Sequence, residues 1–140
     1  MPVTFGPSKS HPSYFTYLIN TPLGDPVFGG YLICRSGGTV WIVAPASTEV
    51  TRTWHCRNDA VTTAESNAAC GDWFVPTCGQ LKNPGYTCRT YWDSCSSGLY
   101  WSSTHNLYCA WGVNFDTGTT YITNNLQWSC CVRAFRCVTY

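Results

Sequence analysis

The clearest structural signal in the sequence is Gly30-Tyr31-Leu32-Ile33-Cys34-Arg35-Ser36-Gly37-Gly38-Thr39-Val40-Trp41-Ile42-Val43. Two runs rich in aliphatic and aromatic residues flank a Gly-Gly pair, a combination typical of a β-hairpin. We therefore predict two antiparallel strands, over 30–34 and 39–43, that are joined by a glycine turn.

Helical signals follow in the middle of the chain. Asp59 can cap a helix that runs to about Ala69, and Gly71 occupies the position of a C-cap glycine. Thr77-Cys78-Gly79-Gln80 is a capping-box pattern, and the helix that it opens should be short because Asn83-Pro84-Gly85 stops it.

The last forty residues have the pattern of antiparallel strands. Strands are expected over 99–102, 108–115 and 121–122, with a turn at Asp116-Thr117-Gly118-Thr119 and a closing strand over 130–138. Helices near the middle followed by strands indicate the α+β class.

The composition favours one neutral, aromatic-rich domain. The chain has 140 residues, of which 11% are charged and 16% aromatic, and a net charge of +1 with no basic run. A nucleic-acid partner is therefore not expected, and the longest apolar run, over 40–46, is too short for membrane insertion. A surface of Ser, Thr, Asn, Gly and Tyr suits either an adaptable binding surface or a rigid polar exterior.

Cysteine is unusually frequent. The ten cysteines are Cys34, Cys56, Cys70, Cys78, Cys88, Cys95, Cys109, Cys130, Cys131 and Cys137. This even count predicts up to five disulfides formed in an oxidising compartment. Zinc binding is the alternative, but no C-x2-4-C pair occurs; fewer bridges with free buried thiols is another. The spacing does not determine the connectivity.

The N-terminal region predicts an extended arm. Residues 1–24 contain four prolines, with a possible strand over 14–19, and the compact domain is expected to span 25–140. No secretory signal is visible, because the first thirty residues hold one cation, Lys9, and no apolar core segment. A trimmed signal, a leaderless export route or assembly into a virus particle would each reconcile this start with the cysteines, and we favour the virus particle.

Several motifs resemble a known family. They are Gly29-Gly30-Tyr31-Leu32-Ile33, Asp72-Trp73-Phe74-Val75-Pro76-Thr77 with Gln80-Leu81, Tyr100-Trp101-Ser102-Ser103-Thr104, Ala110-Trp111-Gly112-Val113-Asn114-Phe115 and Val132-Arg133-Ala134-Phe135-Arg136. The second is similar to a D-W-x-L-P-[ST]-x-x-E-L signature. In this order the motifs resemble the Lcl C-terminal-domain family, related to the formylglycine-generating-enzyme-like branch of the C-type-lectin fold.

The resemblance implies small twisted antiparallel sheets, two short helices and long loops, here stapled by disulfides. It also implies adhesive or ligand-binding roles on bacterial surfaces and in phages, with the binding face near the C-terminal strands. The chain departs from the family in its many cysteines and in Pro84, which shortens the second helix.

An enzymatic role is not expected. His11, His55 and His105 lie in no catalytic motif, and no local motif selects two cysteines for the oxidative chemistry of the enzymatic relatives. The Glu-Pro-Asn and Trp-Asn-Asp signatures of calcium-dependent lectins are absent, so we expect no metal and no cofactor.

Two functions remain open, both at a virion or extracellular surface. The first is an adhesin that binds a cell-surface protein or glycan receptor. The second is a capsid decoration protein or filament subunit that joins other subunits of a homo-oligomer through residues 1–24. The candidate ligand contacts of the adhesin are Tyr91, Trp92, His105, Asn106, Tyr108, Asn124, Asn125 and Trp128.

Overall fold

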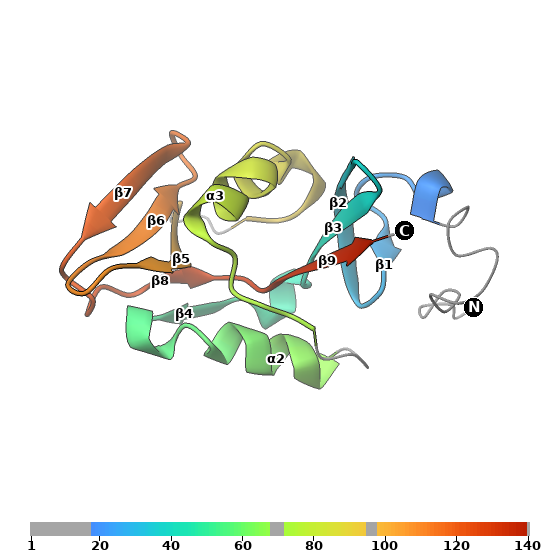
Figure 1. Cartoon of the computed structure of the whole chain (residues 1–140). Helices are drawn as coiled ribbons and strands as arrows, with labels where there is room; N and C mark the ends of the chain where they lie inside the picture. The colour runs from blue at the N-terminus through green and yellow to red at the C-terminus, as the bar shows by residue number, and fades with distance from the viewer. Residues whose placement is uncertain (1–17, 68–71, 95–97, 140) are drawn as a thin grey trace.

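The computed structural model describes residues 18–67, 72–94 and 98–139, which form two β-sheets with short helices between them (Figure 1). A four-stranded sheet has the order β1-β2-β3-β9, with β1 (Pro26–Val27), β2 (Gly30–Ser36), β3 (Thr39–Val43) and β9 (Phe135–Thr139). A five-stranded sheet has the order β4-β8-β5-β6-β7, with β4 (Val50–Arg52), β8 (Cys130–Val132), β5 (Leu99–His105), β6 (Ala110–Asn114) and β7 (Thr119–Thr123). The predicted α+β class is confirmed.

The helices lie on both sides of the region where the two sheets meet (Figure 1). The longest, α2 (Asp59–Asn67), runs along one side, and α3 (Cys78–Gln80) with η4 (Leu81–Tyr86) covers the other. The remaining single turns are η2 (Ala46–Thr48), η3 (Trp54–Cys56) and η5 (Arg89–Tyr91). None of the helices in the described part of the chain is long and apolar enough to cross a membrane.

The predicted hairpin is confirmed as β2 and β3. Tyr31 pairs with Val43 and Ser36 with Thr39, and a β-bulge after Leu32 shifts the register. The turn needs glycine because residues 37 and 38 have φ values of +58° and +80°, a region that other residues rarely adopt.

The predicted closing strand over 130–138 is wrong, because the chain forms two strands that belong to different sheets. β8 pairs with β4 and β9 pairs with β3, so this segment crosses the molecule from one sheet to the other (Figure 1). The crossover is Arg133-Ala134, both buried, where the Ala44 N–H donates to the Ala134 carbonyl at 3.0 Å. Alternation of residues does not reveal this break because both flanking pieces have strand periodicity.

The helix signals are confirmed within the described residues. α2 begins at Asp59 and places Ala60 and Ala64 in the core, while residues 68–71, and with them the expected C-cap, lie outside the described residues. At α3 both capping-box bonds form: the Thr77 N–H donates to Gln80 Oε1 at 2.9 Å and the Gln80 N–H to Thr77 Oγ1 at 3.2 Å. Asn83, with φ −144° and ψ 110°, interrupts the helix beyond it.

Residues 18–24 pack on the domain. Residues 18–20 form a helical turn, Leu18 is fully buried, and Leu23 lies against the same core cluster. The Arg35 Nε–H donates to the Leu18 carbonyl at 2.9 Å, and a second guanidinium N–H donates to Thr21. The predicted arm of residues 1–24 therefore includes a stretch that belongs to the core, and the rest of the predicted strand over 14–19 lies outside the described residues.

The described cysteines are mostly free thiols. Cys131 is disulfide-bonded. Seven others are free in this structure, so the predicted framework of five disulfides is not formed among them. They are Cys34, Cys56, Cys78, Cys88, Cys109, Cys130 and Cys137.

Candidate binding surface

Two loops emerge side by side at one end of the five-stranded sheet. His105 pairs with Ala110 at the end of β5–β6, and Ala110 pairs in turn with Thr123 at the end of β7. The β5–β6 turn and the loop between β7 and β8 are therefore neighbours at the end of the sheet where β7 finishes (Figure 1). We call residues 105–109 and 122–128 together the distal surface.

The distal surface gathers six of the eight predicted contact residues: His105, Asn106, Tyr108, Asn124, Asn125 and Trp128. It is also apolar, since Leu107 is 84% exposed, Tyr108 74% and Trp128 45%, and Ile122 is exposed as well. Leu107 and Ile122 were not among the predicted contacts, because no local motif marks them and only the pairing of β5, β6 and β7 brings them to the same end of the sheet. Exposed apolar side chains gathered in one region are typical of an interaction surface.

Two of the predicted asparagine contacts shape the loops from within. Asn106 Oδ1 accepts hydrogen bonds from the N–H groups of Tyr108, at 3.0 Å, and Cys109, at 2.8 Å. Asn125 Oδ1 accepts from the Gln127 N–H at 3.3 Å. The side-chain oxygens of Asn106 and Asn125 therefore stabilise the turns of their own loops.

The buried Trp54 side chain packs against residues of the distal surface and holds its two loops on the sheet. Trp54 is buried, its indole N–H donates to the Ser102 carbonyl at 3.0 Å, and its backbone N–H donates to the Leu126 carbonyl at 3.1 Å. The His105 ring lies 5.0 Å from the Trp54 ring, and the Arg57 guanidinium lies 3.7 Å from the ring centroid. η3 thus ties both loops to the sheet, which reduces the conformational entropy lost when a ligand binds.

The predicted contacts Tyr91 and Trp92 lie elsewhere. Both border a groove of about 410 Å³ beside Asp25, Tyr31 and Asp93. Tyr91 is exposed, but Trp92 is only 5% exposed, and its indole N–H donates to the Gly85 carbonyl at 3.0 Å. We therefore revise the prediction for Trp92: packing, rather than ligand contact, accounts for its position.

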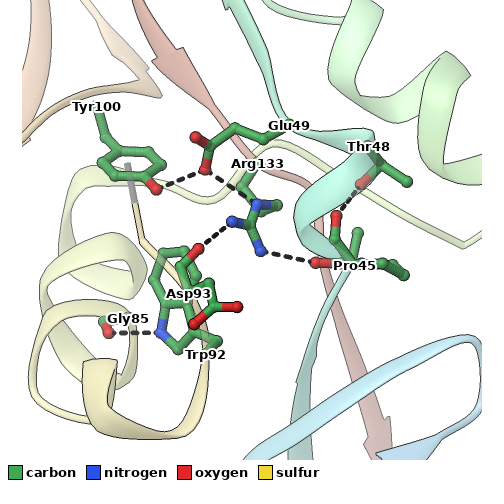
Figure 2. Close-up of polar contacts among 9 residues, drawn as sticks. Pro45, Thr48, Glu49, Gly85, Trp92, Asp93, Tyr100 and Arg133 are labelled. Carbon is green, nitrogen blue, oxygen red and sulfur yellow. Dashed lines mark hydrogen bonds and ion pairs between the residues drawn. The ribbon is translucent and has the colours of Figure 1, made fainter. Parts of the chain in front are cut away.

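Figure 2 shows Trp92 beside Arg133, whose side chain is hydrogen-bonded to Glu49 and to the carbonyl of Asp93. The Arg133 guanidinium lies 5.0 Å from the Trp92 ring centroid. Arg133 is almost wholly buried, and its Nε lies 3.0 Å from Glu49 Oε1. Its other nitrogens donate to the carbonyls of Ala44, at 2.9 Å, and Asp93, while the Tyr100 hydroxyl donates to Glu49 Oε1 at 2.5 Å. Since this charge is paired and hydrogen-bonded, the cluster serves the scaffold and not a ligand.

A second groove, of about 460 Å³, lies between α2 and the extended segment 73–75. It is lined by Arg57, Asn58, Val61, Thr62, Trp73, Phe74, Val75 and Ser103. The sequence does not indicate this groove, because its walls come from segments separated along the chain.

No metal site is formed by the described residues: within 18–67, 72–94 and 98–139, no group of three or more His, Cys, Asp or Glu side chains is placed to hold an ion. The sequence matches no family model and no curated protein.

Proposed function

We propose that this chain is a non-enzymatic adhesin of C-type-lectin-like fold, at a virion or extracellular surface, that binds a protein or glycan receptor through the distal surface. The observation that carries the proposal is the gathering of six predicted contacts with exposed Leu107 and Ile122 at one end of the sheet. The motif resemblance and the mixed architecture support the lectin-like assignment.

The test is binding of the purified chain to receptor-bearing cells and to a glycan array. The double variant Tyr108→Ala, Trp128→Ala should lose at least about tenfold in binding, because aromatic side chains dominate recognition surfaces. Because both residues are exposed, the free energy of unfolding of the variant should lie within about 0.5 kcal/mol of that of the parent chain. Tyr91→Ala tests the place of binding: Tyr91 is an exposed aromatic residue and a predicted contact that lies away from the distal surface, so this variant should bind like the parent chain, and a comparable loss would place the receptor at the groove that Tyr91 borders.

A structural role in a capsid or filament is the second candidate, and β7 favours it. β7 is an edge strand of the five-stranded sheet, and its sequence, Thr-Thr-Tyr-Ile-Thr, has no charge. An uncharged edge strand can pair with another chain. Sedimentation separates the two functions: assembly that rises with concentration, without receptor binding, supports the structural role, whereas receptor binding by a non-assembling chain supports the adhesin.

A further inference from the structure

The two sheets have four outer strands, and three of them carry features that oppose pairing with another chain. β1 has only two residues, one of which is Pro26. β4 has three residues and carries the exposed Arg52. β9 carries Arg136, and its first residue, Phe135, is already paired on the outer side with Phe74. Short strands, proline, charge and a covering segment are the usual means by which proteins protect the edges of their sheets.

β7, the fourth outer strand, has none of these features. Its five residues, Thr119 to Thr123, include no charge and no proline, and they pair with β6 in continuous register without a bulge. Thr119, Thr120 and Ile122 are exposed. No strand in the described part of the chain pairs with the other side of β7, which lies at the outside of the molecule in Figure 1. The outward N–H and C=O groups of β7 are therefore available to another strand.

The one large side chain of β7 that reaches across the sheet leaves room for a second strand. A Cβ on Gly112 would lie 2.4 Å from the Tyr121 hydroxyl, so the Tyr121 ring lies over β6. Its hydroxyl donates to the Tyr100 carbonyl of β5 at 3.0 Å. The ring therefore points away from the free edge, and a neighbouring strand at the usual spacing of about 4.8 Å would not meet it.

We propose that β7 pairs with β7 of a second copy of this chain, antiparallel and related by a two-fold axis at Tyr121. This register pairs all five residues of each strand: Tyr121 with Tyr121, Thr119 with Thr123 and Thr120 with Ile122. Pairs of β-branched residues are favourable across strands, and a two-fold axis brings no like charges together here because the strand has none. The two five-stranded sheets then form one continuous sheet.

The proposal deepens the second candidate function, the structural role, on which it rests, by naming the partner, and it does not depend on the adhesin proposal. Because the paired strands run in opposite directions, the two distal surfaces, which begin at Ile122, lie at opposite ends of the joined sheet. A contact of five residues from each copy is small, so the dimer should be weak and should form only at high protein concentration.

The test is sedimentation of the full chain from about 10 µM to about 1 mM, where a small interface associates. The parent chain should pass reversibly from monomer to dimer. Thr120→Lys should weaken this association at least about tenfold, because the two lysines lie on one face at diagonal positions about 7–8 Å apart. Thr51→Lys is the matched control: Thr51 is an exposed threonine of β4, at the opposite edge of the same sheet, and this variant should associate as the parent chain does.

A mixture of variants tests the two-fold pairing itself. Thr120→Glu should also associate weakly, whereas an equimolar mixture of Thr120→Lys and Thr120→Glu should form a dimer, because opposite charges then meet across the strands. A mixture that stays monomeric would contradict the register.

The outcomes separate this proposal from the proposed functions. A parent chain that stays monomeric throughout would overturn both the β7 contact and the structural role. Association of Thr120→Lys equal to that of the parent, in a chain shown to be folded by circular dichroism, would overturn the β7 contact alone. Thr120 lies outside the distal surface, so Thr120→Lys should bind the receptor as the parent chain does, and loss of receptor binding by the distal-surface variant is measured independently.

Discussion

At the scale of single residues, burial separates the ion pairs into two kinds. Arg52 and Asp59 form a pair at 2.8 Å on the surface, with side chains 43% and 53% exposed. Arg133 and Glu49 form a pair at 3.0 Å with side chains 1% and 16% exposed. Water competes with the first pair and not with the second, so their contributions to stability should differ.

Glu49→Ala should therefore destabilise the chain by about 3 kcal/mol, because it leaves the Arg133 charge buried with only carbonyl partners and removes the acceptor of the Tyr100 hydroxyl. Arg52→Ala, which breaks the exposed pair, should cost at most about 1 kcal/mol. Urea denaturation measures both. Equal losses for the two variants would contradict a structural role for the buried pair.

Gly112 allows close packing of β6. A Cβ at this position would lie 2.3 Å from the Tyr100 carbonyl oxygen and 2.4 Å from the Tyr121 hydroxyl. Gly112→Ala should cost about 3 kcal/mol or more, because the Tyr100 oxygen is backbone and cannot move aside. Gly79→Ala is the matched control: the nearest atom to its Cβ is 4.0 Å away, and a helical alanine should be neutral or slightly stabilising. Thermal unfolding of both variants checks the contrast.

At the scale of elements, local signals were readable from the sequence and long-range ones were not. The hairpin of β2 and β3 and the cap at Thr77 depend on residues close together in the chain, and both were predicted. The break at Arg133 depends on Glu49 and Ala44, which are distant in sequence, and it was missed. In the same way, most of the distal surface was predicted because it is formed by neighbouring loops of one sheet. The groove between α2 and segment 73–75 was not predicted, because its lining comes from segments far apart in the chain.

Two free thiols on different elements are in contact. Cys34 lies on β2 and Cys88 precedes η5; both thiols pack on the same core cluster, and Cys34 is close enough to perturb the Cys88 pKa. Burial, followed by the nearby Cys34, raises the pKa of Cys88 to about 11. At neutral pH Cys88 is therefore protonated, and its reactivity should rise as the pH approaches this value, since the thiolate is the nucleophile.

Exposure to oxidised glutathione should therefore link Cys34 to Cys88. The two thiols together lose two electrons and two protons. Oxidised glutathione takes up these electrons and protons and is released as two molecules of glutathione thiol. Peptide mapping without reduction should find the linked peptides, and the bridge should stabilise the chain by about 2–4 kcal/mol. Cys56, an exposed free thiol, is the internal reference and should be alkylated faster than Cys88 at pH 8. Recovery of separately alkylated Cys34 and Cys88 after oxidation would refute this pairing.

At the scale of the whole molecule, the core extends further toward the N-terminus than the sequence suggests. Leu18 is fully buried among residues of α2, β2, β3 and β9, and Arg35 binds the carbonyls of Leu18 and Thr21. Composition did not reveal this because prolines and polar residues surround the few apolar side chains. Any arm that joins subunits should therefore lie within residues 1–17, and residues 18–24 should be required for folding.

Two truncations test this division. Removing residues 1–17 should leave a folded chain with the stability of the parent, whereas removing residues 1–24 should destabilise it by about 3 kcal/mol or more, since the site of buried Leu18 becomes empty. Leu18→Ala in the full chain isolates the core contribution, with an expected cost of about 2–5 kcal/mol, and Ile19→Ala, at an exposed neighbour, should cost little. Denaturation curves and sedimentation of each variant separate folding from assembly. If the chain that lacks residues 1–17 folds but no longer assembles, the arm is the assembly element; if it assembles like the parent, the contact lies on the folded domain, where the uncharged edge of β7 is the candidate.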